Sequence, residues 1–242
     1  MLKDYELIDL TNKITEKIPV WPQDPKLEIT RFAILEKDGY NLNMLKIGEH
    51  TGTHFGVPFH FFKEGRSVDE VPISDLVLPA IKIDISNKCS KDSDYTLKIE
   101  DILLWEKKHE RIPKNSFVII CTGWYKKWKN PRDYLGLDKT GKMHFPGFSK
   151  EAVIFLMEKR RIKGVGIDTH GVDPGIDEKY EASKALFKLG GYSIENLTNL
   201  SKIPPKGFFI FIGALPISKG TGSPARVIAL VKKRMKKGYD TI

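Results

Sequence analysis

Three short apolar runs place the strongest limit on how this chain can fold. Residues 116–121, 164–167 and 208–212 are rich in Val, Ile and Phe and are bounded by Gly or Pro. Short runs without polar alternation are typical of strands that are buried on both faces. Such a strand needs a packed layer on each side, so we expect helices against a sheet.

Other segments add further strands and helices. Asp38-Gly39 lies between two strand patterns and indicates a hairpin turn. Strand and helix do not alternate regularly, and no linker or repeat interrupts the chain. We therefore expect the α/β class, with a mixed β-sheet in one domain spanning residues 1–242. The predicted strands cover residues 28–35, 42–47, 80–85 and 227–231, and the predicted helices cover residues 99–109 and 149–159.

The composition of the 242 residues excludes several classes of protein. Hydrophobic residues make up 40% and charged residues 29%, which is typical of a globular protein and excludes wholesale disorder. No apolar run approaches the roughly 20 residues that a membrane span needs. The N-terminal MLKDYELIDL lacks the apolar core of a secretory signal. We expect a cytoplasmic protein with no membrane partner.

The charge and the cysteines exclude further classes. A net charge of +9 is spread along the chain without a nucleic-acid-binding motif, so we expect no nucleic-acid partner. The one concentrated basic run, residues 232–237, is interpreted as a solvated tail. Cys89 and Cys121 belong to no Cys/His cluster, which excludes a zinc finger, and they are interpreted as small core or loop residues.

Three of the six histidines fall within eleven residues, in the segment EHTGTHFGVPFH. His50 and His54 are four residues apart, but the glycines, β-branched residues and proline around them favour a folded loop over a helix. Gly52 permits a positive φ, and Pro58 stiffens the approach to His60, so the three imidazoles can converge. Because imidazole is the commonest metal ligand in proteins, the cluster predicts a metal site. The alternative is that one or more of these histidines only caps a loop.

The segment HTGTHFGVPFH resembles the HxGTHxDxPxH signature of the cyclase family of metal-dependent hydrolases, which includes bacterial kynurenine formamidase. The resemblance implies the family's swivelling β/β/α fold. It also implies an arylformamidase-like hydrolase that acts on carbon–nitrogen bonds other than peptide bonds. Four further segments are similar to family motifs in the same order: PVWPQDP at 19–25, TGW at 122–124, GIDTHGVDP at 166–174 and IENL at 194–197.

The resemblance also implies roles for individual residues. His170 lies in GIDTHGVDP at a position where the family has no ligand. It is a candidate further metal ligand, and the alternative is a loop histidine that supports the ligands. The other implied roles are metal ligands at His50, His54 and Glu195, a catalytic acid/base at His60 and a substrate contact at Trp21.

Two positions depart from the family pattern. The Asp of the motif is Gly56 here, and the His expected twelve residues before Glu195 is Ser183. Two dications repel each other strongly unless anionic ligands bridge them, so these changes predict one divalent ion per chain. Histidine and carboxylate ligands suit Zn²⁺ or Mn²⁺.

Aromatic and acidic residues near the motifs keep further interpretations open. The aromatics of the histidine segment either form core or line a pocket for a planar ring. His144 either lines the mouth of such a pocket or lies elsewhere. Three carboxylates, Asp168, Asp173 and Asp177, do not have EF-hand spacing and are interpreted as solvated turn residues or as groups that order the backbone.

These features together predict hydrolysis of a small cyclic or N-acyl amide, imide or ester. A bound cation lowers the pKa of water from about 15.7 toward about 7, and His60 is expected to move the proton. The alternative is a catalytically inactive, metal-free binding protein that kept the fold. The expected partners are a small-molecule substrate and, on the resemblance alone, further copies of the chain in a homo-oligomer.

Overall fold

The computed structural model describes residues 2–233. Its strands are β1 (Tyr5–Asp9), β2 (Glu28–Ala33), β3 (Leu42–Lys46), β4 (His54–Gly56), β5 (Val77–Asp84), β6 (Thr96–Leu97), β7 (Phe117–Cys121), β8 (Gly147–Phe148), β9 (Gly164–Ile167), β10 (Tyr192–Glu195), β11 (Phe208–Ala214) and β12 (Gly222–Lys232). Its α-helices are α1 (Leu35–Asp38), α2 (Ser86–Cys89), α3 (Ile99–Lys108), α4 (Pro131–Leu135), α5 (Lys150–Ile154) and α6 (Glu181–Lys188).

A mixed eight-stranded sheet forms the centre, in the order β1-β12-β11-β5-β7-β9-β10-β4. The pairs β5–β7, β7–β9 and β9–β10 are parallel, and the other pairs are antiparallel. Because β12 also pairs with β4, every strand of this sheet except β1 belongs to a closed barrel. The predicted α/β class with a mixed sheet is confirmed.

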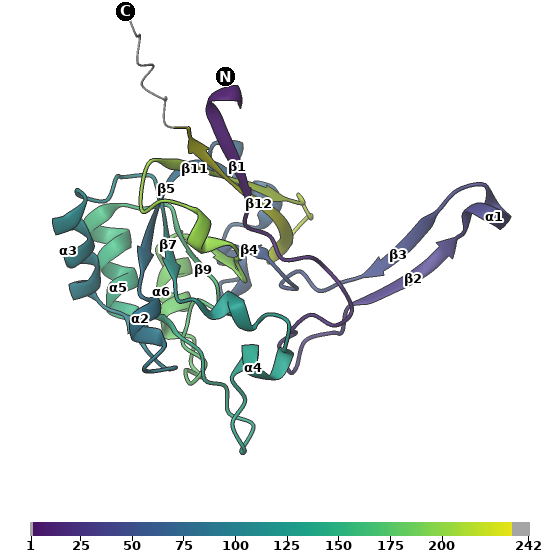
Figure 1. The fold of residues 1–242 in the computed structure, drawn as a ribbon, viewed down its shortest axis with the longest axis horizontal. Coiled ribbons are helices and arrows are strands. Elements are labelled where there is room, and N and C mark those ends of the chain that lie inside the picture. The colour runs from purple at the N-terminus through teal and green to yellow at the C-terminus, as the bar shows by residue number, and fades with distance from the viewer. Residues whose placement is uncertain (1, 234–242) are drawn as a thin grey trace, which may run out of the picture.

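The strands β7 and β9 are apolar throughout, and every residue of both is buried. In β7, Phe117 and Ile119 belong to the core inside the barrel, whereas Val118 and Ile120 belong to the core shared with α3, α5 and α6. These helices lie side by side against β5, β7 and β9 (Figure 1). The expectation of helices packed against buried strands is thus confirmed.

The predicted helices lie where the sequence placed them, with two corrections. The helix that Ser149 caps continues after α5 as a π-helical segment, Phe155–Arg160. In α3, Ile102 and Trp105 are buried as expected, but Leu103 is 48% exposed. The buried stripe of this helix is therefore narrower than its apolar pattern indicates.

The predicted hairpin forms an arm that projects from the body (Figure 1). Strands β2 and β3 pair only with each other. Their connection is not a two-residue turn but the single helical turn α1, which ends at Gly39 with φ +78°. A glycine suits this left-handed position.

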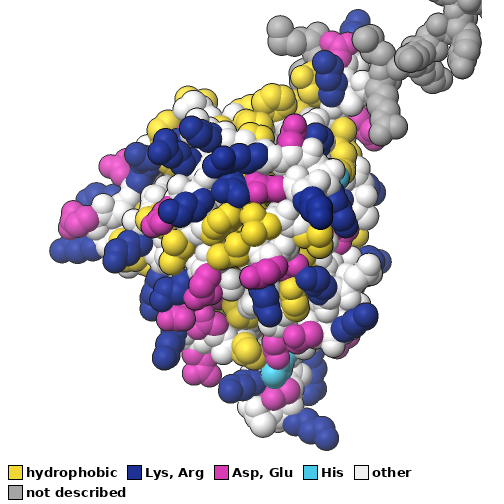
Figure 2. Space-filling view, turned by 90° about the vertical axis from the view of Figure 1, so that its left-hand side faces the viewer, with side chains coloured by type: hydrophobic (Ala, Val, Ile, Leu, Met, Phe, Trp, Pro, Cys, Tyr) yellow, Lys and Arg dark blue, Asp and Glu magenta, His cyan; other side chains and the backbone are white. Residues whose placement is uncertain are grey.

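Four further predictions concern membrane spans, the distribution of charge, the cysteines and the basic run. Within residues 2–233, every helix falls short of the length and apolar character that a transmembrane span requires. Figure 2 shows one face on which Lys and Arg are interspersed with Asp and Glu. Cys89 and Cys121 are free and buried, as expected. Most of the basic run at residues 232–237 lies outside the described residues.

Candidate active site

All six predicted site residues line a single cavity of about 330 Å³. The sequence separates them by up to 174 positions, and the barrel brings them together. They are Trp21, His50, His54, His60, His170 and Glu195.

His54 and Glu195 occupy directly opposite positions on the antiparallel strands β4 and β10. Opposite residues of such a pair point to the same face of the sheet. The Nε2 atom of His54 lies 3.3 Å from Oε2 of Glu195. The predicted loop therefore needs one correction, because His50 lies in a turn but His54 begins a strand.

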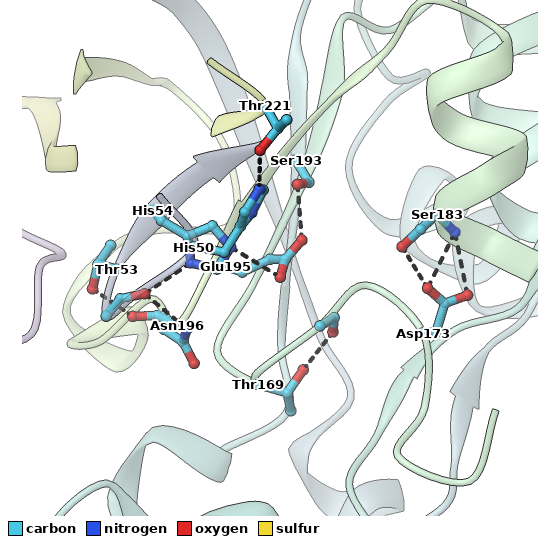
Figure 3. A network of polar contacts seen from close by, with 12 residues as sticks. His50, Thr53, His54, Thr169, Asp173, Ser183, Ser193, Glu195, Asn196 and Thr221 are labelled. Carbon is cyan, nitrogen blue, oxygen red and sulfur yellow. Dashed lines mark hydrogen bonds and ion pairs between the residues drawn. The ribbon is translucent and has the colours of Figure 1, made fainter. Parts of the chain in front are cut away.

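The orientation of His54 is fixed through its other ring nitrogen (Figure 3). Its Nδ1–H donates to the carbonyl oxygen of Gly52 at 2.9 Å. The side-chain amide of Asn196 donates to the same oxygen at 2.8 Å. The Nε2 atom is buried beside Oε2 of Glu195 and makes no hydrogen bond among the described residues.

The Glu195 carboxylate is held between two partners. The Ser193 hydroxyl donates to Oε1 at 2.8 Å, while Oε2 faces His54. Burial raises the pKa of Glu195, but the charge of His54 and the hydrogen bonds outweigh it and bring the pKa to about 2. Burial lowers the pKa of His54, and Glu195 reverses this into a net rise. The carboxylate is therefore anionic at neutral pH.

His50 lies against both other histidines of the segment. Its ring centroid is 5.1 Å from that of His54 and 3.9 Å from that of His60. The Thr221 hydroxyl donates to Glu49, so it accepts a hydrogen bond from Nε2–H of His50 at 2.9 Å. This leaves the Nδ1 lone pair of His50 free for another ligand.

The environment keeps His50 and His60 neutral at pH 7. Burial, with the charges of His54 and His60, lowers the pKa of His50 to about 2. His60 is the exposed histidine of the cluster, at the end of a 3-10 turn, Pro58–His60. Desolvation within the cavity lowers its pKa too, with Glu195 acting in the opposite direction. A neutral imidazole on the cavity wall can accept a proton.

His170 follows β9, lines the cavity and is buried. Its Nε2 atom has no hydrogen-bond partner among residues 2–233. Burial, and then the charge of His54, lower its pKa to about 4. The Trp21 ring packs edge-on against it, with centroids 5.5 Å apart.

His54 and Glu195 are spaced as two ligands of one cation would be. Two ligands of a tetrahedral zinc ion lie about 3.4 Å apart, which is close to the separation of His54 Nε2 and Glu195 Oε2. The unpartnered Nε2 atoms of His54 and His170 are further donors that need a partner. Among the described residues, no three His, Cys, Asp or Glu side chains already surround one ion position. Binding therefore requires a third donor of the cavity to move toward the His54 and Glu195 pair.

The two positions that depart from the family motif hold no acidic or imidazole ligand. A Cβ atom at Gly56 would lie 2.5 Å from the Ser193 hydroxyl oxygen. The Ser193 side chain therefore occupies the space that a side chain at position 56 would need. The Ser183 hydroxyl donates to the buried Asp173 carboxylate, which also accepts from the backbone at the start of α6. Neither position offers a ligand for a second ion.

Several residues of the cavity wall belong to no motif that the sequence shows. Phe145, Tyr180 and Phe187 line the cavity, although each lies far from the histidine segment. Asp24 also lines it, within PVWPQDP; burial raises its pKa, against the charges of His54 and His60. In PVWPQDP, the family resemblance implies a role for Trp21 alone, as a substrate contact.

Other residues near the motifs lie elsewhere. Among the aromatics of the histidine segment, Phe61 lines the cavity, whereas Phe55, Phe59 and Phe62 pack in the cores. His144 is paired with Asp94 and Asp138 and does not line the cavity. Two of the three turn carboxylates are buried rather than solvated, since Asp168 accepts from Thr122 and Tyr125 and Asp173 from Ala182 and Ser183. Asp168, Asp173 and Asp177 all accept hydrogen bonds from backbone amides, which agrees with the interpretation that they order the backbone.

Comparisons with known proteins identify relatives that match nearly the whole chain. The isatin hydrolase of Roseibium aggregatum is 32% identical, over 95% of this chain and 93% of its own. The kynurenine formamidase of Bacillus thuringiensis is 28% identical, over 94% and 98%. A solved isatin hydrolase bound to the product analogue thioisatinate superimposes with a TM-score of 0.91 at 30% identity, covering 96% and 94%. A predicted metal-dependent hydrolase from Bacillus stearothermophilus gives 0.70 at 26% identity, covering 93% and 98%.

The profile of one protein family also matches the chain. It is described as "Putative cyclase" and covers residues 8–174, which include the histidine segment and the GIDTHGVDP segment. With most of its length matched by this profile and by an isatin hydrolase, the chain belongs to the cyclase family, as its histidine motif predicted.

Proposed function

We propose that this chain hydrolyses a small cyclic or N-acyl amide, imide or ester in the cavity that the histidines line. One divalent cation, Zn²⁺ or Mn²⁺, would be held by His54 and Glu195 with His50 and His170 as further ligands. The observation that carries the proposal is the pairing of His54 and Glu195 on opposite strands, which places the buried Nε2 of His54 3.3 Å from the Glu195 carboxylate without a hydrogen bond among the described residues. A metal cofactor also agrees with the description of one solved relative as a metal-dependent hydrolase.

The chain's own residues would divide the work of this reaction. The cation supplies Lewis acidity, which favours attack of water on a carbonyl carbon. His60 is neutral and lies on the cavity wall, so it can accept a proton from water and return it to the leaving nitrogen. Gly52 and Ser193 hold His54 and Glu195 in place through the hydrogen bonds described above.

The cavity favours a flat, partly aromatic substrate. Aromatic side chains form much of its wall, with Trp21 and Phe145 edge to face at 6.3 Å. A volume of about 330 Å³ suits a small molecule. The names of two relatives, isatin hydrolase and kynurenine formamidase, indicate aromatic amides of this size. Trp21 is accordingly proposed as a substrate contact.

We further propose that the protein acts in the cytoplasm and as a homo-oligomer. The first is supported by Cys89 and Cys121, which are both free rather than joined in a disulfide. The second is supported by exposed apolar side chains on the projecting strands β2 and β3, among them Phe32 at 68% and Met44 at 59%.

One experiment separates this proposal from an inactive binding protein. Protein purified without chelator is analysed for metal, and hydrolysis of isatin and of N-formylkynurenine is followed by absorbance. We expect about one ion per chain and turnover of at least one substrate; His54→Ala should lose both. His109→Ala is the matched control, because His109 stacks on Trp105 away from the cavity. A metal-free wild-type protein that turns over neither substrate would favour the inactive alternative, and two ions per chain would contradict the single-ion proposal.

A further inference from the structure

The cavity that the histidines line carries several negative charges and no balancing lysine or arginine. Among the described residues of its wall, four are carboxylates and none is Lys or Arg. The carboxylates are Asp24, Asp173, Asp177 and Glu195. Since the chain as a whole has a net charge of +9, this excess of negative charge is a local property of the cavity.

Three of these carboxylates already have partners in the fold. Glu195 lies beside His54. Asp173 is turned toward α6, where it accepts from the Ser183 hydroxyl and from backbone amides (Figure 3). Each oxygen of Asp177 accepts from a backbone amide. These three carboxylates are therefore committed to the proposed cation or to the local backbone.

Asp24 is the carboxylate of the wall that has no partner among residues 2–233. Burial and the charges of two histidines act on it, but no hydrogen bond does. The residue is exposed and lines the cavity, so it lies at the mouth. Burial, and then the charges of Asp173 and Asp24, raise the pKa of Tyr180, so the Asp24 carboxylate is within electrostatic range of that ring. Asp24 therefore offers an unpaired anion beside an aromatic side chain.

The aromatic side chains of the cavity form one continuous wall. Neighbouring ring centroids along it are 5.7 to 6.3 Å apart. Aromatic faces carry partial negative charge, so they attract a cation that lies within about 6 Å of a ring centroid. One ammonium group already makes such a contact, since Nζ of the exposed Lys184 lies 5.9 Å from the centroid of Phe61. In order along the wall, the rings are Phe145, Trp21, Tyr180, Phe61 and Phe187.

Tyr180, in the middle of this wall, has a strained backbone. Its φ of 55° and ψ of 46° lie in the left-handed region, which disfavours side chains larger than that of glycine. Such residues cluster at binding sites, where surrounding contacts compensate for the strain. The ring of Tyr180 packs against Trp21 at 6.3 Å and Phe61 at 5.7 Å. These contacts hold it on the cavity wall in spite of the strain.

We propose that the substrate is an aromatic amide or ester that also carries an ammonium group, which Asp24 and the rings of Trp21 and Tyr180 bind. This inference rests on the proposed hydrolase function and adds the charge of the substrate to it. The ammonium group would give Asp24 the partner that it lacks and would lie against ring faces that attract positive charge. A substrate with an anionic group would instead meet four carboxylates, which selects against it.

Three acetophenones that differ in charge test the proposal. Acetophenones keep the carbonyl group of an amide but cannot be hydrolysed, so only binding is measured. The para substituent is trimethylammonio in the cation, tert-butyl in its neutral isostere and carboxylate in the anion. Isothermal titration calorimetry on the protein purified with its metal should show the cation binding about 10-fold more tightly than the neutral ligand, and the anion most weakly. Added salt should weaken binding of the cation but not of the neutral ligand.

Asp24→Asn tests the carboxylate with little change in shape. This variant should lose most of the preference for the cation over the neutral ligand. Glu178→Gln is the matched control, because Glu178 is exposed and absent from the cavity wall. Its charge also raises the pKa of Tyr180, but less than burial and the aspartates of the wall do. The control should therefore keep the preference, and a general effect of net charge would appear in both variants.

Metal analysis of the same proteins separates substrate binding from metal binding at Asp24. Wild type, Asp24→Asn and Glu178→Gln should hold equal amounts of metal. Loss of metal in Asp24→Asn alone would assign this carboxylate to the divalent cation and overturn the proposal.

The ligand series on the wild type keeps the proposal testable even if a variant fails to fold. Equal affinities of the cation and its neutral isostere, tighter binding of the anion, or no binding of the cation would each contradict it. A protein that prefers the cation but hydrolyses neither isatin nor N-formylkynurenine would keep the ammonium site and lose the proposed reaction. The two proposals can therefore fail separately.

Discussion

Ser193 and Gly56 are directly opposite each other across β10 and β4, and the Ser193 hydroxyl oxygen lies 2.5 Å from where a Cβ at position 56 would be. The same hydroxyl donates to Glu195. The space that an aspartate at position 56 would need is therefore used to hold the carboxylate at position 195. The two residues together hold Glu195 as the carboxylate beside His54.

Restoring a side chain at position 56 should destabilise the protein. We expect Gly56→Ala to lower the free energy of unfolding by about 1–3 kcal/mol, because the new methyl group overlaps the Ser193 hydroxyl. Gly56→Asp should cost at least as much, and the added change Ser193→Gly should restore part of the loss. Thermal unfolding of the four proteins measures these effects.

Gly171→Ala is the matched control for this series. A Cβ at Gly171 would meet nothing closer than 3.8 Å, and the residue also lines the cavity. Its unfolding temperature should stay close to that of the wild type. Equal effects of the alanine changes at positions 56 and 171 would show that the space beside Ser193 is not restrictive.

Asn196 should control metal affinity although it is not a ligand. Its side chain donates to the Gly52 carbonyl that also orients His54, and its backbone is next to Glu195. Removing an outer partner of a metal ligand typically costs 10- to 100-fold in affinity. We therefore expect Asn196→Ala to weaken cation binding by about that factor, measured by competition with a chromophoric chelator.

Asn199→Ala provides a close control for Asn196→Ala. Asn199 also has a positive φ, of 58°, and its amide donates to a backbone carbonyl, that of Asp9, at 2.8 Å. It is absent from the cavity wall. This variant should lose stability but keep its cation affinity. Parallel losses of affinity in both variants would indicate general loosening of the fold rather than a specific effect on His54.

The sequence predicted elements whose pattern is local and missed features that depend on pairing. β7 could be located because its burial on both faces leaves an apolar run. The barrel closure could not, since β4 has only three residues and closes the sheet by pairing with β10 and β12. The arm could be identified as a hairpin, but its separation from the body leaves no local signal.

The site shows the same division. The histidine spacing and the family motifs identified six of the residues that line the cavity. The 3.3 Å contact of His54 with Glu195 depends on a strand register set across 141 positions of the chain, which no local pattern encodes. Asn196 and Ser193 lie in or beside the IENL segment, but their contacts with Gly52 and Glu195 depend on the folded structure, so the sequence does not predict their part in the site.

His144 should make stability depend on pH. Its hydrogen bond to Asp94, and the contact with Asp138, raise the pKa of His144 above its ordinary value of 6.5. A raised pKa means that the protonated form is favoured in the folded state. The contribution is therefore fully present below pH 6.5 and is lost as the pH rises through the higher folded-state value.

Urea unfolding of the wild type and His144→Ala at about pH 5.5 and about pH 9 measures this contribution, because histidine changes its charge between them. The difference in free energy of unfolding should be larger at the lower pH. Asp94→Asn should reduce that difference when combined with His144→Ala in a double-mutant cycle. A difference that grows toward high pH would contradict the assignment.

Trp21 should affect substrate binding more than the chemical step. Its ring lines the cavity beside Phe145, so it can contact a planar substrate without touching the reacting carbonyl. We expect Trp21→Ala to raise KM for an aromatic amide by about 3- to 10-fold with kcat nearly unchanged, the pattern that loss of uniform binding produces. Trp21→Phe keeps an aromatic face and should stay within about twofold of the wild type. A fall in kcat at constant KM in both variants would instead assign Trp21 to positioning His170, against which it packs.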